Sequence, residues 1–142
     1  MPSEFNQHAD IVSFANMDVR LIEGVGSPRD LTIAEMTVNS DGGAPLHRSL
    51  DEEKTFVMTQ GHLRFTVGDV TRDIAAGDTV TVAKGDAHGF TNTMEAPARM
   101  LLVSTPARHD AFFRAIAALP VPHDPDAVRD VCETYRQVIL GG

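Results

Sequence analysis

Residues 42–61, GGAPLHRSLDEEKTFVMTQG, and residues 77–92, GDTVTVAKGDAHGFTN, decide the fold of this chain. Both stretches alternate short apolar or β-branched runs with glycines suited to turns, and neither keeps a helical period. The same pattern extends over a longer region, from Asp30 to Pro106. This region predicts about eight short strands, with the number and spacing typical of a β-barrel or sandwich.

Turn residues set the expected strand boundaries. Gly61 separates two of the strands, and Gly68-Asp69 is a doublet that favours a hairpin, so we expect the central strands to be antiparallel neighbours. Residues 39–47 begin with turn-forming residues and are expected to form a turn and a loop. The predicted strands are Leu31–Val38, Thr55–Gln60, His62–Val67, Val70–Ile74, Asp78–Ala83, His88–Thr93 and Arg99–Ser104.

After Pro106 the apolar spacing becomes helical. Apolar residues recur on one face of residues 109–119, and Pro120 ends that pattern. A second helix is predicted from its N-cap Asp124, with Pro125 at the first position, to Gly141. Its expected apolar face is Val128, Val131, Tyr135 and Val138. We therefore expect one domain over residues 1–142, with a barrel at about 11–106 and a helical tail at 107–142 packed outside it.

Composition narrows the class of partner. The net charge is −8 and the basic residues are scattered, which argues against the basic patch that nucleic acid or an anionic membrane requires. The first ten residues lack the order of a secretion signal, and no apolar run is long enough to span a bilayer, so a cytoplasmic protein is expected. Cys132 is the single cysteine and is interpreted as a packed small hydrophobe.

The two opening stretches resemble the two motifs of the cupin superfamily. The first motif of that family has a His-x-His pair and a following glutamate, which fall here on His47, Ser49 and Lys54. In the second motif Gly77, Gly85, His88 and Asn92 match, and Ala83 stands where proline is usual. The resemblance implies a mainly β, double-stranded β-helix of jelly-roll type with two short C-terminal helices. Residues 97–99 and 110–113 are also similar to the tail of quercetin-dioxygenase-like small cupins.

The resemblance also implies a divalent metal held by three histidines and a glutamate, but here the motif is degenerate. His47 and His88 match, Ser49 is a poor ligand, and an ammonium about 4 Å from a dication costs roughly 8 kcal/mol at an effective dielectric near 20. We therefore expect no cofactor. Zinc, iron, nickel or manganese would require Lys54 to lose its proton or a carboxylate to replace it, giving His47, His88 and Glu52 as ligands; Asp51 and Glu53 are alternatives to Glu52.

Strand parity predicts which side chains face the barrel interior, because residues two apart share a face. The side chains expected to point inward are Lys54, Phe56 and Met58 from one strand, Leu63 and Phe65 from the next, and His88, Phe90 and Asn92 from the far motif. A lysine on a charged run could equally face solvent. If Lys54 is buried, its pKa should fall. The expected substrate contacts are Ser49, Phe56, Met58, Phe65, Phe90 and Asn92.

These residues suggest acid–base chemistry on a small molecule. We expect an isomerase, cyclase or lyase acting on a carbonyl-bearing metabolite, with His47, Lys54 and His88 as the catalytic groups. The alternatives are a non-catalytic binding or sensing barrel, and a metal-dependent dioxygenase-like protein using His47 and His88. The remaining histidines (His8, His62, His109 and His123) are expected at the surface. The resemblance further suggests a homodimer that covers an open sheet edge.

Overall fold

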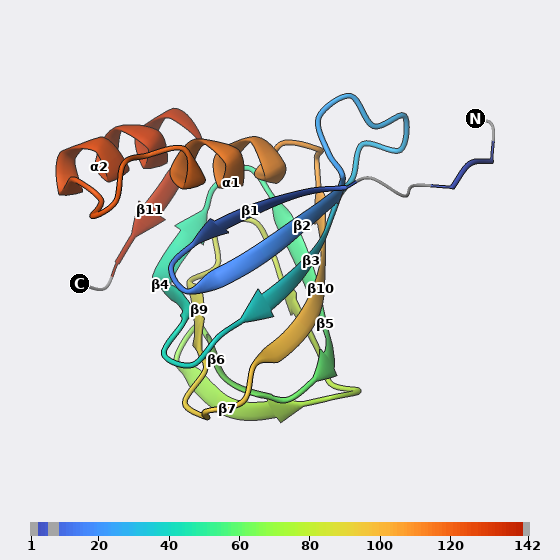
Figure 1. Ribbon diagram of the computed structural model, residues 1–142, viewed down its shortest axis with the longest axis vertical. Coiled ribbons are helices and arrows are strands. Elements are labelled where there is room, and N and C mark those ends of the chain that lie inside the picture. Colours follow the sequence, from blue (N-terminus) through green and yellow to red (C-terminus); the bar gives the residue numbers. More distant parts are fainter. Residues whose placement is uncertain (1–2, 6–8, 141–142) are drawn as a thin grey trace.

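Two antiparallel sheets face each other, and two helices lie across one end of them (Figure 1). This arrangement comes from a computed structural model that describes residues 3–5 and 9–140. It confirms the mainly β fold with two C-terminal helices. Within the described residues, no helix is both long and apolar enough to cross a membrane.

Each sheet combines strands that are distant in sequence. The six-stranded sheet runs in the order β1 (Asp10–Phe14), β2 (Met17–Glu23), β3 (Thr32–Val38), β10 (Ala98–Thr105), β5 (Glu53–Gln60) and β8 (Thr79–Val82). The five-stranded sheet runs in the order β11 (Gln137–Ile139), β4 (Gly43–Ser49), β9 (His88–Thr91), β6 (His62–Val67) and β7 (Val70–Ala75). Both expected motif histidines therefore belong to adjacent strands of one sheet.

Alternating side chains fill the space between the sheets. One buried cluster contains Phe56 and Met58 from β5 together with Leu63 and Phe65 from β6. The ring centroids of Phe56 and Phe65 lie 5.1 Å apart in an edge-on arrangement, which is favourable for aromatic pairs. The predicted inward parity of β5 and β6 is thus confirmed, and it carries Lys54 inward with Phe56.

The segment that we expected to be a loop before His47 is strand β4. It pairs with β9, and the register places His47 opposite His88. The two strands approach closely at Gly43, where φ is +147° and an added Cβ would lie 2.0 Å from the Phe90 carbonyl oxygen. Glycine is therefore required there for the close backbone approach, rather than for a turn. The N-terminal strands β1 and β2 were also not predicted.

The second helix is shorter than expected. Helix α2 (Pro125–Thr134) begins with the predicted cap, since the Asp124 carboxylate accepts a hydrogen bond from the Asp126 amide at 3.2 Å. It ends before Val138, which belongs to β11 and pairs with Arg48 of β4. The prediction that Val138 continues the helix is wrong, because pairing with a distant strand overrides local spacing. Gly141 lies outside the described residues.

Helix α1 (His109–Ala117) is fixed to the six-stranded sheet by its first turn. The buried Asp110 carboxylate accepts hydrogen bonds from the Val25 amide at 3.1 and 3.2 Å and from the Thr32 hydroxyl at 3.2 Å. These bonds, together with Phe113 in the core, hold the beginning of α1 against the end of the barrel. The helical tail therefore packs against one end of the barrel and covers it.

Candidate functional site

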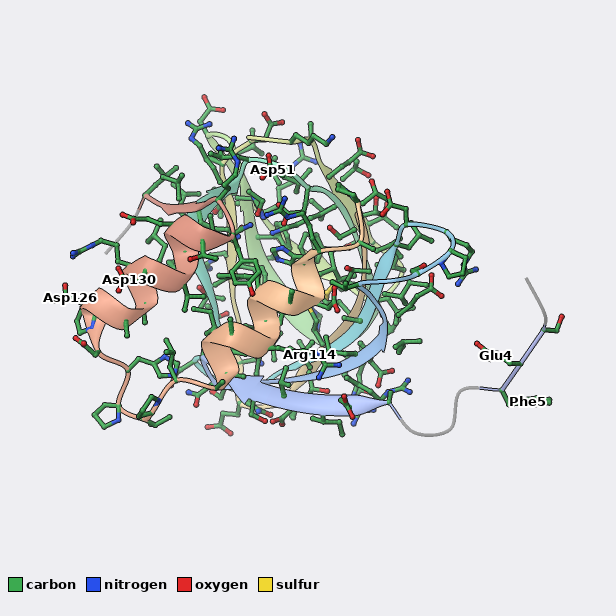
Figure 2. The ribbon with its side chains drawn as sticks, turned by 90° about the horizontal axis from the view of Figure 1, so that it is seen from above. Glu4, Phe5, Asp51, Arg114, Asp126 and Asp130 are labelled. Carbon is green, nitrogen blue, oxygen red and sulfur yellow. The ribbon has the colours of Figure 1, made fainter. Side chains whose placement is uncertain are left out.

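A cavity of about 240 Å³ opens between the sheets beneath the two helices. Strands of both sheets, α1, α2 and β11 contribute to its wall, and Figure 2 shows both helices lying across this end of the sheets. Most of the lining is apolar. Its aromatic members are Phe14, Phe56, Phe90, Phe112 and Phe113, and its polar members are His47, Lys54, His109, His123 and Gln137.

Three residues from the strands form the first polar group, here called the strand cluster: His47, Lys54 and His88. Lys54 comes from β5 and is only 2 % exposed, so the alternative of a solvated lysine is wrong. Its Nζ lies 3.0 Å from His88 Nε2 and 3.4 Å from His47 Nε2. One amine is therefore held between two imidazoles.

Backbone hydrogen bonds fix the proton positions on both rings. His47 Nδ1 lies 2.7 Å from the Pro45 carbonyl oxygen, and His88 Nδ1 lies 3.0 Å from the Asp86 carbonyl oxygen. A carbonyl can only accept, so each Nδ1 donates, and each Nε2 of a neutral ring presents a lone pair. Both lone pairs converge on the Lys54 amine, which donates to them.

Burial lowers the pKa of all three groups. Desolvation lowers the pKa of Lys54 to about 7, although the carboxylate of Glu52 acts in the opposite direction. Desolvation, followed by the charge of Lys54, lowers the pKa of His47 to about 4 and that of His88 to about 2. At neutral pH the rings are uncharged, and the amine exchanges its proton readily.

The residues of the strand cluster do not fit a divalent metal. The two Nε2 lone pairs, which are the usual ligand atoms, are directed at an amine instead of an open position. Among the described residues, no group of three or more His, Cys, Asp or Glu side chains is arranged to hold an ion. Glu52, the expected replacement ligand, contacts other residues. The ligand set His47, His88 and Glu52 is not assembled here.

A second polar group, here called the tail cluster, consists of Glu52, Arg108, His109 and Gln137. His109 Nδ1 and Arg108 Nε each lie 3.5 Å from Glu52 Oε1. Gln137 Nε2 lies 3.3 and 3.4 Å from the two Glu52 oxygens, and its Oε1 accepts a hydrogen bond from the Ser49 hydroxyl. His109 is 1 % exposed, so the prediction of a surface position is wrong.

Sequence reasoning missed His109 because its burial is a tertiary effect. The Asp110 anchor turns the first residues of α1 inward, and its partners are on the loop after β2 and on β3. Gln137 was missed because β11 was expected to be helical. No local signal identifies either residue. Two other histidines differ in outcome: His62 is exposed, as expected, whereas His123 is half-buried at the cavity. His8 lies outside the described residues.

The structure separates the expected substrate contacts into two groups. Phe56 and Phe90 line the cavity, as do His47 and Lys54. His88 is not among the lining residues and reaches the cavity only through its contact with Lys54. Four other residues were expected at the ligand and lie elsewhere: Ser49, Met58, Phe65 and Asn92. The Asn92 amide donates to the Val38 and Ala96 carbonyl oxygens at 2.9 Å and so serves a turn, Ser49 bonds to Gln137, and Met58 and Phe65 are core residues.

Comparisons with known proteins point to one fold. Residues 34–104 match the family model described as "Cupin domain". No functionally curated protein matches the chain. Among solved structures, KdgF from Halomonas sp. is 17% identical, with a TM-score of 0.68 over 78% of this chain and 99% of that one. An RmlC-like cupin from Shewanella frigidimarina is 16% identical, with a TM-score of 0.65 over 76% and 93%.

A third similar structure is described as a sugar phosphate isomerase from a cupin superfamily, from Silicibacter pomeroyi. It is 19% identical to this chain, with a TM-score of 0.57, and the match covers 63% of this chain and 59% of that one. At such identities the likeness shows the fold alone, because the same barrel carries many unrelated reactions. The chemistry must be argued from the cavity.

Proposed function

This chain belongs to the cupin family, and from that premise we propose that it is a small-molecule enzyme in which a buried lysine stands in place of a metal ion. The reaction class that we propose is acid–base isomerisation, cyclisation or elimination of a carbonyl-bearing metabolite. One observation carries the proposal: Lys54 Nζ is held 3.0 and 3.4 Å from two imidazole nitrogens at the wall of an apolar cavity.

The geometry supports a role for Lys54 as a proton donor. An ammonium has three N–H donors, and the two imidazoles accept two of them. The third is available for a carbonyl oxygen of a ligand in the cavity. When a proton leaves the carbon next to that carbonyl, the C–H electron pair moves to the oxygen, and the ammonium stabilises or protonates the resulting enolate. Isomerases, cyclases and lyases of carbonyl compounds share this step.

The pKa of Lys54 suits this task. A group with a pKa of about 7 both gives and takes a proton near neutral pH, which is the condition for efficient acid–base catalysis. His47 and His88 hold the amine in place and accept its hydrogen bonds without competing for the proton, because their own pKa values are lower. The strand cluster therefore works as a positioned, titratable cation.

The lining favours a compact, largely apolar substrate. Five phenylalanines face the cavity, and the lining contains no arginine that could hold a phosphate in a bidentate grip. A sugar phosphate, the substrate class in the description of one similar structure, would leave most of its hydroxyls unpaired against this wall. We therefore propose an aromatic or alicyclic ketone, enol or aldehyde rather than a carbohydrate.

Solvent exchange of carbon-bound hydrogen tests the proposed function without knowledge of the product. The protein is incubated in D₂O with a panel of small apolar ketones and aldehydes, and proton NMR follows loss of the hydrogens next to the carbonyl. Accelerated exchange above that of heat-denatured protein supports the proposal. No acceleration with any compound that raises the melting temperature would contradict it and favour a non-catalytic binding barrel.

Borohydride trapping distinguishes two uses of the same amine. Reduction in the presence of the same panel would fix a Schiff base at Lys54, and peptide mass spectrometry would locate the added mass. A modification confined to Lys54 and absent from Lys84, the other lysine of the sequence, would show covalent catalysis. Exchange without trapping would show acid–base catalysis by the ammonium.

The expected homodimer stays a proposal. Strands β1 and β8 are at the edges of one sheet and β11 and β7 at the edges of the other, so each sheet has backbone groups available for a partner strand. Sedimentation at low protein concentration tests it, and a monomer at all concentrations would contradict it.

A further inference from the structure

The proposed function lacks one component, which is a base to remove the carbon-bound proton. The lone pairs of His47 and His88 are both occupied by the Lys54 amine at 3.4 and 3.0 Å. As long as Lys54 is an ammonium that stabilises the developing oxyanion, none of the three groups in the strand cluster has a free lone pair. The base must come from elsewhere in the cavity wall.

Of the two other histidines that line the cavity, His123 is only half-buried, whereas His109 is buried beside a carboxylate and best meets this requirement. It lines the same cavity, and its Nδ1 lies 3.5 Å from Glu52 Oε1, close enough for an ion pair but without a formed hydrogen bond. The imidazole ring packs edge-on against Phe113 with ring centroids 4.6 Å apart, which limits its rotation. Glu52 is itself 1 % exposed and accepts hydrogen bonds from Gln137, so the carboxylate stays beside the ring.

We propose that His109 is the catalytic base, positioned by Glu52, and that it faces the Lys54 ammonium across the bound ligand; this inference rests on the proposed function. When a ligand draws the ring toward Glu52 from its present 3.5 Å, the carboxylate accepts the Nδ1 proton, which leaves the lone pair on Nε2, on the far side of the ring from Glu52. His109 Nε2 then takes the proton from the carbon next to the carbonyl. The C–H electron pair becomes the enolate, and its oxygen receives the Lys54 N–H.

The charges around His109 balance as the reaction proceeds. Burial, followed by the charges of Lys54, His47 and Arg108, lowers the pKa of His109. The cation that proton transfer creates there therefore depends on the Glu52 carboxylate beside it, while the enolate forms beside the Lys54 ammonium. Return of the proton from His109 to a different carbon of the enolate completes an isomerisation. Arg108 Nε, also 3.5 Å from Glu52 Oε1, shares the same carboxylate oxygen. The mechanism requires the distance from His109 to Glu52 to shorten when a ligand is bound, as catalytic hydrogen bonds commonly do.

Two variants and a matched control test the assignment through exchange in D₂O. His109→Gln should reduce the exchange rate at least ~100-fold while ligands still raise the melting temperature. Glu52→Gln should reduce exchange ~10-fold or more, because the imidazole loses the acceptor that orients it. The control is His62→Gln, an exposed histidine on β6, which should exchange at the wild-type rate. An unchanged rate in His109→Gln would overturn the inference.

Nitrogen-15 NMR of the histidine side chains gives an answer that does not depend on activity. His109 should carry its proton on Nδ1, with an unprotonated Nε2 that shifts when a ketone binds, and the Glu52→Gln variant should lose this preference. A proton on Nε2 in the wild-type protein would overturn the assignment. Absence of exchange in the wild type would reject the proposed function instead, while the tautomer would still decide whether His109 presents a lone pair to the cavity.

Discussion

The strand cluster and the tail cluster reach the same cavity, but they differ in how completely their polar atoms are paired. In the strand cluster both histidines bond a backbone carbonyl on one side and Lys54 on the other. In the tail cluster His109 Nδ1 and Arg108 Nε are buried without a well-formed hydrogen bond, and both approach one oxygen of Glu52 at 3.5 Å. A cluster whose polar atoms are all hydrogen-bonded is rigid before a ligand binds. A cluster with unpaired polar atoms can still form hydrogen bonds when a ligand binds.

The largest expected effect comes from breaking the paired cluster. Lys54→Met keeps an unbranched side chain, one atom shorter, but removes the cation, so the exchange rate should fall by about 10³ or more, because the oxyanion loses its donor. Lys84→Met, at an exposed position, is the matched control and should leave the rate unchanged. Proton NMR in D₂O measures both variants. A variant at position 54 that retains full activity would remove the strand cluster from the mechanism.

The second prediction converts the paired cluster into a metal site. Lys54→Glu would direct a carboxylate to the place where two imidazole lone pairs already converge, giving the two-histidine and one-carboxylate set that binds divalent transition metals. We expect near-stoichiometric zinc or manganese in this variant after dialysis against the metal, and much less in the wild-type protein. Elemental analysis measures both. Equal metal content in the two proteins would show that the amine does not exclude the ion.

The third prediction concerns pH. The folded pKa of Lys54 is about 7, below its ordinary value of 10.5, so between these pH values the unfolded chain binds more protons than the folded one. Below pH 7 the folded protein carries the full free-energy cost of burying the ammonium. As the pH rises above 7 the buried amine loses its proton, this cost disappears, and the free energy of unfolding should increase. Urea midpoints at pH 7, 8 and 9 should therefore increase more steeply in the wild type than in Lys54→Met. Parallel profiles would contradict the lowered pKa.

The acid side of the same profile involves the histidines. The pKa of His47 falls from 6.5 to about 4 and that of His88 to about 2, so between pH 6.5 and 4 the unfolded chain again binds more protons. Stability should decrease as the pH falls through this window. His62→Gln, at an exposed position on β6, is the control and should show the same decrease as the wild-type protein.

The smallest expected effect comes from the tail cluster. Gln137→Ala removes the partner of the Ser49 hydroxyl and one partner of Glu52, and leaving buried polar groups unpaired costs about 1–3 kcal/mol. Gln60→Ala, at an exposed position on β5, is the control and should change stability by less than about 0.5 kcal/mol. Urea unfolding measures both. Equal midpoints would show that the tail cluster is not held through Gln137.

The difference between the clusters also explains what could be predicted from the sequence. Strand parity predicted that Lys54 and Phe56 point inward, and both are buried. Motif spacing singled out His47 and His88, which the structure places opposite each other on β4 and β9. These predictions depend on local alternation and on motif spacing, both of which are visible in the printed sequence. Alternation and motif spacing therefore predicted the part of the cavity wall that holds Lys54 and His47.

The rest of the cavity wall depends on contacts between distant segments. His109 is buried because Asp110 bonds to the loop after β2 and to β3, and Val138 is in a strand because β4 offers it a partner. Helical spacing alone made His109 a surface residue and Val138 a helical one. Neither prediction could be corrected from local sequence, since both outcomes are decided by tertiary pairing.

Strand β11 gives the molecule a built-in reporter. It closes one sheet next to β4, and two of its residues, Gln137 and Ile139, also face the cavity. Just after it, the Leu140 amide donates to the Leu46 carbonyl oxygen at 2.8 Å. A ligand in the cavity that restrains β11 should slow hydrogen–deuterium exchange of the Leu140 amide. This one backbone amide would then report ligand binding in the native protein, without a dye or substrate turnover.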